Sequence, residues 1–207
     1  MYHEIGDGPN SLYVRDKEFS EQMKYLWENN YRVVTLSEGL RMLKAKENMS
    51  KVIAITFDDG YLSFYSKVWP ILREYNFPAT VFVITKNCDN HLYLNWEQLK
   101  FLQANWIEIG SHTQTHPALT QISHAAIVDE VVGSKAILDK NLVYPCQEFC
   151  YPTGVYNKEV VEVVNEAGYE VAVTVNYAKA TRNNEDLLMP RIRIPRGISL
   201  QGFANSI

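Results

Sequence analysis

The sequence predicts an α/β domain built on a parallel β-sheet. Apolar segments of strand length alternate with amphipathic segments of helix length along the whole chain. No repeat, low-complexity tract or linker divides the 207 residues. The composition, 46% hydrophobic and 21% charged, is that of a chain able to bury a core of its own. The spacing of the segments leaves open whether the sheet is open or closes into a barrel.

The N-terminal quarter predicts two helices and two strands. Apolar residues recur at i, i+4, i+7 and i+8 from Phe19, which predicts an amphipathic helix over 16–29. The β-rich run 31–36 predicts a strand, and Ser37 is expected to cap the helix that follows. Residues 51–57 are almost continuously apolar, as in a buried parallel strand.

A helix is expected over 62–75, where Pro70 predicts either a kink or a late helix start. The next strand is expected over 79–84. Asn95 should cap the following helix, with Gln98 in the third position of a capping box. The remaining expected elements are a strand at 106–110, a helix at 123–139, a strand at 148–151, a helix at 158–167 ended by Gly168, and strands at 169–175 and 191–195.

Charge and hydropathy exclude several classes of protein. Twenty basic against 24 acidic residues give a net charge of -4 with no basic stripe, which argues against sequence-independent nucleic-acid binding. The longest apolar runs are about seven residues, against roughly 20 needed to cross a bilayer. The chain opens without the basic and apolar segments of a signal peptide. We therefore expect either a cytoplasmic protein or the domain of an exported one.

The three cysteines, Cys88, Cys146 and Cys150, cannot all pair with one another. Cys146 and Cys150 are four residues apart, but no second Cys/His pair nearby completes a zinc site. We expect three buried or semi-buried thiols.

Polar residues with metal-binding chemistry follow two of the expected strands, where parallel α/β folds collect their sites. Asp58 and Asp59 come directly after 51–57, and adjacent carboxylates there need a cation or an arginine to compensate them. The alternative is a solvated turn or a helix N-cap pair. His112 and His116 follow 106–110, and their spacing lets both imidazoles reach one ion. The alternative is a pair of surface histidines.

The residues at the two strand ends together are a more specific signal for a metal site than the residues at either strand end alone. One carboxylate and two imidazoles make a three-ligand set that leaves a position open for water, as in catalytic metal sites. The second carboxylate is then free to act as a base on that water.

The segments Thr56-Phe57-Asp58-Asp59-Gly60 and Ser111-His112-Thr113-Gln114-Thr115-His116 resemble the first two motifs of the NodB-like polysaccharide deacetylases, carbohydrate esterase family 4. The resemblance implies a distorted (β/α) barrel, here one catalytic domain over residues 1–207. It also implies a divalent metal, most often Zn²⁺, with Co²⁺ or Ni²⁺ as alternatives. Carried onto the matching positions, it makes Asp59, His112 and His116 the ligands and Asp58 the general base.

The family's third motif is matched only in part by Cys150-Tyr151-Pro152-Thr153-Gly154. By resemblance, the Thr153 N–H is the oxyanion donor. The arginine that usually steadies the base is replaced by Cys150, and Arg191 is our candidate for a substitute from elsewhere in the chain. A structural ion pair is the alternative role for Arg191.

The family's last motif supplies a histidine acid near the C-terminus, where this chain has none. The first expected strand carries His3 instead, an order that resembles the permuted poly-N-acetylglucosamine deacetylases. His3 would then protonate the leaving amine. The alternative is a frayed terminal residue.

The resemblance implies removal of N-acetyl groups from a polysaccharide that contains N-acetylglucosamine, such as poly-N-acetylglucosamine, peptidoglycan or a chitin-like polymer. One alternative is an O-acetyl esterase acting on xylan or another acetylated glycan. Another is a carbohydrate-binding domain that has lost its chemistry. We expect a monomer acting on cell-wall or biofilm polysaccharide, in an extracellular or cell-surface location.

Overall fold

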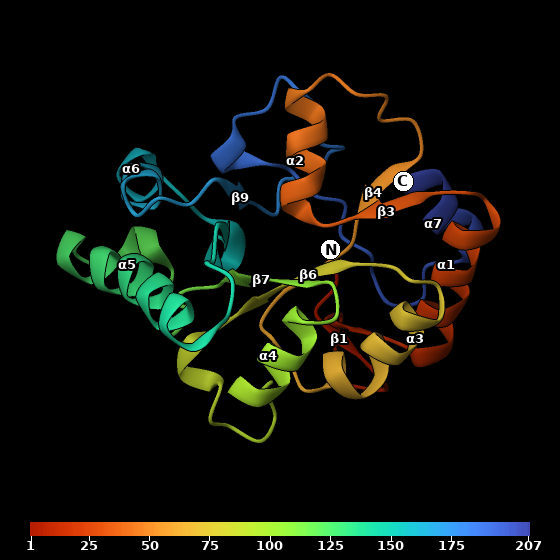
Figure 1. The fold of residues 1–207 in the computed structure, drawn as a ribbon, viewed down its shortest axis with the longest axis horizontal. Coiled ribbons are helices and arrows are strands. Elements are labelled where there is room, and N and C mark those ends of the chain that lie inside the picture. The colour runs from red at the N-terminus through yellow and green to blue at the C-terminus, as the bar shows by residue number, and fades with distance from the viewer.

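Five parallel strands in chain order form the main sheet of the computed structural model, which describes residues 1–207 (Figure 1). They are β5 (Thr56–Phe57), β6 (Ala79–Val83), β7 (Ile107–Ser111), β8 (Glu148–Cys150) and β9 (Val171–Val173). A parallel pair, β3 (Arg32–Val34) and β4 (Val52–Ala54), precedes them, and β1 (Glu4–Ile5) pairs with β2 (Tyr13–Val14). The result is a curled half-barrel, which confirms the expected fold class.

Helices surround the strands, with α5 and α6 on one side of the view, α1 and α7 on the opposite side, and α2 and α4 above and below (Figure 1). The helices are α1 (Asp16–Glu28), α2 (Leu36–Lys44), α3 (Trp69–Glu74), α4 (Trp96–Gln103), α5 (His124–Asn141), α6 (Lys158–Glu166) and α7 (Leu200–Ser206). None of them combines the length and the hydropathy needed to cross a membrane.

The hydrophobic core lies between the strands and these helices. It contains, among others, Phe19 of α1, Phe57 of β5, Leu99 of α4 and Val131 of α5, all almost fully buried. The three cysteines are free and buried, as predicted.

The predicted strand 51–57 is divided at Ile55. β4 pairs with β3, whereas β5 pairs with β6, and the Ile55 carbonyl accepts a hydrogen bond from the Thr80 N–H at 2.9 Å. The chain therefore passes from the β3–β4 pair to the main sheet within a continuous apolar run. The apolar pattern does not indicate where this change of partner strand occurs.

The predicted strand 191–195 is wrong. The segment lies beside the sheet and makes isolated backbone bonds, from Arg191 N–H to Asn176 and from Ile194 N–H to Met1. Pro190 and Pro195 at its two ends lack the N–H groups that a continuous ladder requires.

The predicted cap of α2 is also wrong. Thr35 is the N-cap, and its hydroxyl accepts from the Glu38 N–H. The Ser37 hydroxyl instead donates to the carboxylate of Glu108, a residue far along the chain. Both hydroxyl residues suit an N-cap, so a partner distant in sequence decides between them.

Two expectations about where helices begin are confirmed. The helix expected over 62–75 opens with a π-helical turn (Phe64–Val68), and α3 begins only at Trp69, next to Pro70. Asn95 and Gln98 form the expected capping box of α4. The strand β1 lies within the expected first strand that carries His3, whereas the short strand β2 and the helix α7 were not expected.

Candidate active site

The carboxyl ends of β5 and β7 bring three potential metal ligands together. Oδ1 of Asp59 lies 3.6 Å from Nε2 of His112 and 3.8 Å from Nε2 of His116. Atoms bound to one zinc ion at about 2.1 Å in a tetrahedron lie about 3.4 Å apart. The three side chains therefore have a spacing that one divalent ion can bridge with little movement.

The protonation states of these side chains suit a cation. Burial lowers the pKa of His112 to about 3 and also lowers the pKa of His116, so both imidazoles are neutral near pH 7 and can act as ligands. Burial, with the charge of Asp58 beside it, raises the pKa of Asp59 to about 7. A buried carboxylate whose anion is disfavoured in this way is stabilised by a bound cation. The donor set thus fits a divalent metal.

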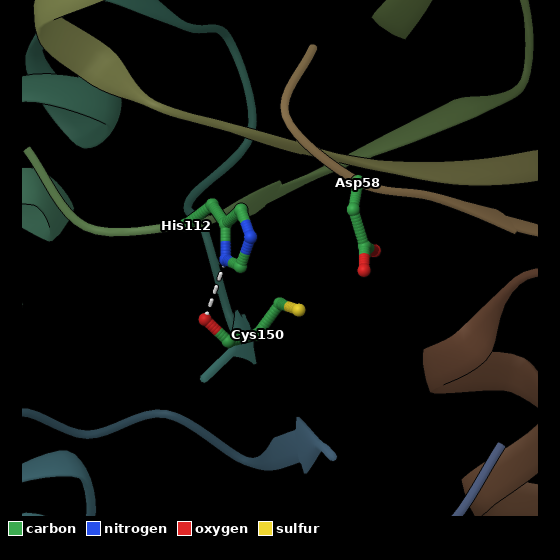
Figure 2. A group of neighbouring side chains, drawn as sticks. All are labelled: Asp58, His112 and Cys150. Atoms are coloured by element: carbon green, nitrogen blue, oxygen red, sulfur yellow. Dashed lines mark hydrogen bonds between the residues drawn. The ribbon is translucent and has the colours of Figure 1, made fainter. Parts of the chain in front are cut away.

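The orientation of His112 is fixed by β8. Nδ1 of His112 lies 2.7 Å from the carbonyl oxygen of Cys150, as Figure 2 shows. A carbonyl only accepts, so Nδ1 carries the proton and Nε2 presents its lone pair toward Asp59.

A second group of potential ligands, Asp58, His112 and Cys150, lies next to the first (Figure 2). The guanidinium of Arg191 already donates to both Asp58 oxygens and to the Cys150 sulfur. A positive charge at this position disfavours a cation. Of the two groups, Asp59, His112 and His116 are therefore the candidate metal site.

Asp58 and Arg191 form a bidentate ion pair although they are 133 residues apart. Nη1 lies 2.6 Å from Oδ1 and Nη2 lies 2.7 Å from Oδ2, and both side chains are buried. Burial alone would raise the pKa of Asp58, but the guanidinium holds it well below its usual range. Asp58 is consequently ionised and fixed in orientation beside the candidate metal site.

His3 lies on the other side of Asp58, with its Nε2 4.0 Å from Oδ2. Its segment is not frayed: the Tyr2 N–H donates to Thr56, and the Asp58 N–H donates to the Tyr2 carbonyl. Burial lowers the pKa of His3, while the Asp58 charge opposes this shift. The imidazole therefore lies next to the Asp58 carboxylate and interacts with its charge.

Thr153 is the one predicted site residue that has neither a hydrogen bond nor a contact within 4.0 Å between ionisable groups with another of the seven. It lies in the turn that follows β8, with a positive φ of 57°, and its hydroxyl donates to the Pro152 carbonyl at 2.6 Å. The structure thus places it near the sheet end that carries the site.

Glu130 of α5 supports the site and was missed in the sequence. Its Oε2 accepts from the N–H groups of Gln114 and Thr115, at 2.8 and 2.9 Å, and its Oε1 accepts from the Thr115 hydroxyl. These bonds hold the loop between the two histidines, in which Thr113 and His116 have positive φ values of 67° and 63°. A carboxylate on the apolar face of a predicted helix was the signal that could have found it.

The chain is similar to known proteins described as polysaccharide deacetylases. A family model described as polysaccharide deacetylase matches residues 45–172. The chain is 35% identical over 204 residues to "Putative polysaccharide deacetylase YxkH" of Bacillus subtilis (strain 168), covering 98% of this chain and 73% of that protein. It is 28% identical over 195 residues to a poly-beta-1,6-N-acetyl-D-glucosamine N-deacetylase of Staphylococcus aureus, covering 87% of this chain and 67% of the relative.

The chain is also similar to the solved structure of a deacetylase. The Streptococcus pyogenes deacetylase PplD in complex with acetate superposes with a TM-score of 0.94 and 30% identity, covering 100% of this chain and 95% of PplD.

Replacing His112 with alanine should weaken zinc binding by more than about 100-fold, beyond the loss typical of an outer-shell partner. The reason is that His112 supplies one of only three ligand atoms. Competition with a chromogenic chelator measures the affinity. His124→Ala, which removes an exposed histidine paired with Glu159, is the matched control and should bind zinc as the wild type does. Unchanged affinity in His112→Ala would show that the metal binds elsewhere.

Replacing Glu130 with glutamine should weaken zinc binding roughly tenfold, because the histidine loop loses a charged acceptor. The same chelator competition applies, with thermal unfolding recorded beside it. Glu159→Gln, on the exposed face of α6, is the control. If Glu130→Gln lowers the unfolding temperature but leaves zinc affinity intact, the carboxylate stabilises only the fold.

Proposed function

The chain belongs to the polysaccharide deacetylase family, and from this membership and the site geometry we propose that it is a metal-dependent hydrolase of N-acetyl groups on a polysaccharide that contains N-acetylglucosamine. One observation carries the proposal. The Asp59, His112 and His116 ligand set directly adjoins Asp58, an ionised carboxylate that is itself excluded from metal binding by Arg191. A ligand set beside an independent base is what hydrolysis of an amide requires.

Asp59, His112 and His116 would hold the metal, which we propose to be zinc from the mixture of nitrogen and oxygen donors. When bound, such an ion lowers the pKa of a water molecule and polarises a carbonyl oxygen. The protein's part is to present two neutral imidazoles and one carboxylate on rigid strand ends, and to leave one side open toward the substrate.

Asp58 would accept the proton of the attacking water. Each of its oxygens is engaged by Arg191 and retains a second lone pair for that proton. Its low pKa means that the proton is held only briefly. His3 is neutral at rest because of its burial, and its Nε2 lies 4.0 Å from Oδ2 of Asp58. The proton taken up by Asp58 would pass to His3, and the resulting imidazolium would deliver it to the amine as the C–N bond breaks.

Thr153 would complete the site through its backbone. The turn of Thr153 and Gly154, both with positive φ, lies beyond β8, next to the strand end that carries Cys150. An N–H presented there would stabilise the oxyanion that forms on the acetyl group.

The substrate class follows from the relatives. The Staphylococcus aureus relative is named for poly-beta-1,6-N-acetyl-D-glucosamine, and we propose a polymer of this chemistry for the present chain. Such polymers lie outside the cytoplasm, so we also propose extracellular or cell-surface action, by a monomer.

The purified protein should release acetate from N-acetylglucosamine oligomers, lose this activity when chelated, and regain it when zinc or cobalt is restored. The reason is that the three ligands hold the ion reversibly. Enzymatic detection of acetate measures release, and acetylated xylan serves as the comparison substrate. Acetate release from acetylated xylan alone would show that the protein hydrolyses acetate esters and not N-acetyl amides. No release from either polymer by metal-loaded protein would contradict the proposed activity.

Asp58→Asn should keep zinc bound while kcat falls roughly 10²–10⁴-fold, the contribution typical of a general base. The amide is nearly isosteric but accepts no proton at neutral pH. Zinc affinity and kcat are measured on the same preparation. Asp186→Asn, which removes an exposed carboxylate paired with Lys44, is the control. Loss of zinc by Asp58→Asn would mean that Asp58 and Asp59 have exchanged roles.

A further inference from the structure

We propose that Cys150 is a positioning residue, whose thiol sulfur orients the Arg191 guanidinium against Asp58. Its kinetic part rests on the proposed function, because it concerns the same base. Cys150 is fully buried at the end of β8, at the position where the third motif usually has an arginine. The substitution thus places a small, neutral acceptor beside an arginine that comes from another part of the chain.

All five N–H groups of Arg191 have an acceptor. Nε donates to the Thr174 carbonyl at 3.0 Å, and Nη1 donates to the Thr56 hydroxyl at 3.2 Å and to Asp58. Nη2 donates to Asp58 and, through its remaining N–H, to Sγ of Cys150 at 3.3 Å. Without the sulfur, one N–H of a buried guanidinium would lack a partner.

The sulfur suits this place because it is a weak acceptor. A second carboxylate at position 150 would compete with Asp58 for the guanidinium and would bring a third negative charge next to Asp59. The thiol instead satisfies the last N–H and leaves both bonds to Asp58 intact. It fixes the plane of the guanidinium from the side opposite Thr56, and thereby fixes the plane of the base.

The same residue contacts the metal side of the site through a different atom. The Cys150 carbonyl accepts from Nδ1 of His112, whereas its side chain turns toward Asp58 (Figure 2). A substitution of the side chain retains the carbonyl. Its effects should therefore fall on Arg191 and Asp58 and spare the zinc ligands, which separates positioning from a general structural role.

The experiment compares Cys150→Ala, Cys150→Ser and Cys146→Ala. Cys146 is also buried, but its thiol donates to the Glu148 carbonyl and does not contact Arg191, so Cys146→Ala is the matched control. We expect kcat of Cys150→Ala to fall roughly tenfold, within the range of coupled neighbours, with KM and zinc affinity unchanged. Cys150→Ser, which restores an acceptor, should recover most of the loss. In an Arg191→Lys background, Cys150→Ala should have little further effect.

A second measurement does not depend on activity. Hydrogen exchange of the Arg191 guanidinium protons, followed by ¹⁵N-edited NMR of the full chain, should be faster in Cys150→Ala and unchanged in Cys146→Ala. Unchanged exchange in Cys150→Ala would overturn the proposal. An equal fall in kcat for Cys146→Ala, or a loss of zinc affinity in Cys150→Ala, would also overturn it. If the wild type releases no acetate, the proposed function fails, while guanidinium exchange still decides the role of Cys150.

Discussion

The ion pair between Arg191 and Asp58 determines how the two adjacent carboxylates of the site can coexist. Both would be costly to bury as anions so close together. The guanidinium compensates Asp58, and Asp59 remains facing two imidazoles. The pair therefore divides the carboxylates into one that is held by the protein and one that is available to a cation. The strand order, the histidine loop and the N-terminal segment bring the remaining groups of the candidate site close to these two carboxylates.

The part of the site formed by strand ends was predictable from the sequence. Asp58 and His112 come directly after a strand, Asp59 and His116 follow within four residues, and parallel strands collect such residues at one edge. Most helices were predictable for a related reason, since periodicity and capping residues are local signals. Asn95 with Gln98 is the clearest case, because both partners of the capping box lie within four residues.

The contacts made over long distances in the chain were not predictable in the same way. Arg191 meets Asp58 across 133 residues, and only the resemblance to a known family, not any periodicity, suggested it as the arginine beside the base. Glu130 supports the histidine loop from a helix whose sequence pattern gives its face but not its partner. Ser37 was preferred as a cap because its bond to Glu108 could not be foreseen. The wrong strand at 191–195 has a local cause, since Pro190 and Pro195 at its ends lack the N–H groups that a ladder requires.

The N-terminal segment docks beside β5, and the segment around residues 189–194 docks beside β9. They bring His3 and Arg191 to a candidate site whose potential metal ligands all lie between residues 59 and 116. Because the three potential ligands precede Arg191 in the chain, Asp58 gains its guanidinium partner only when the segment around residues 189–194 has docked.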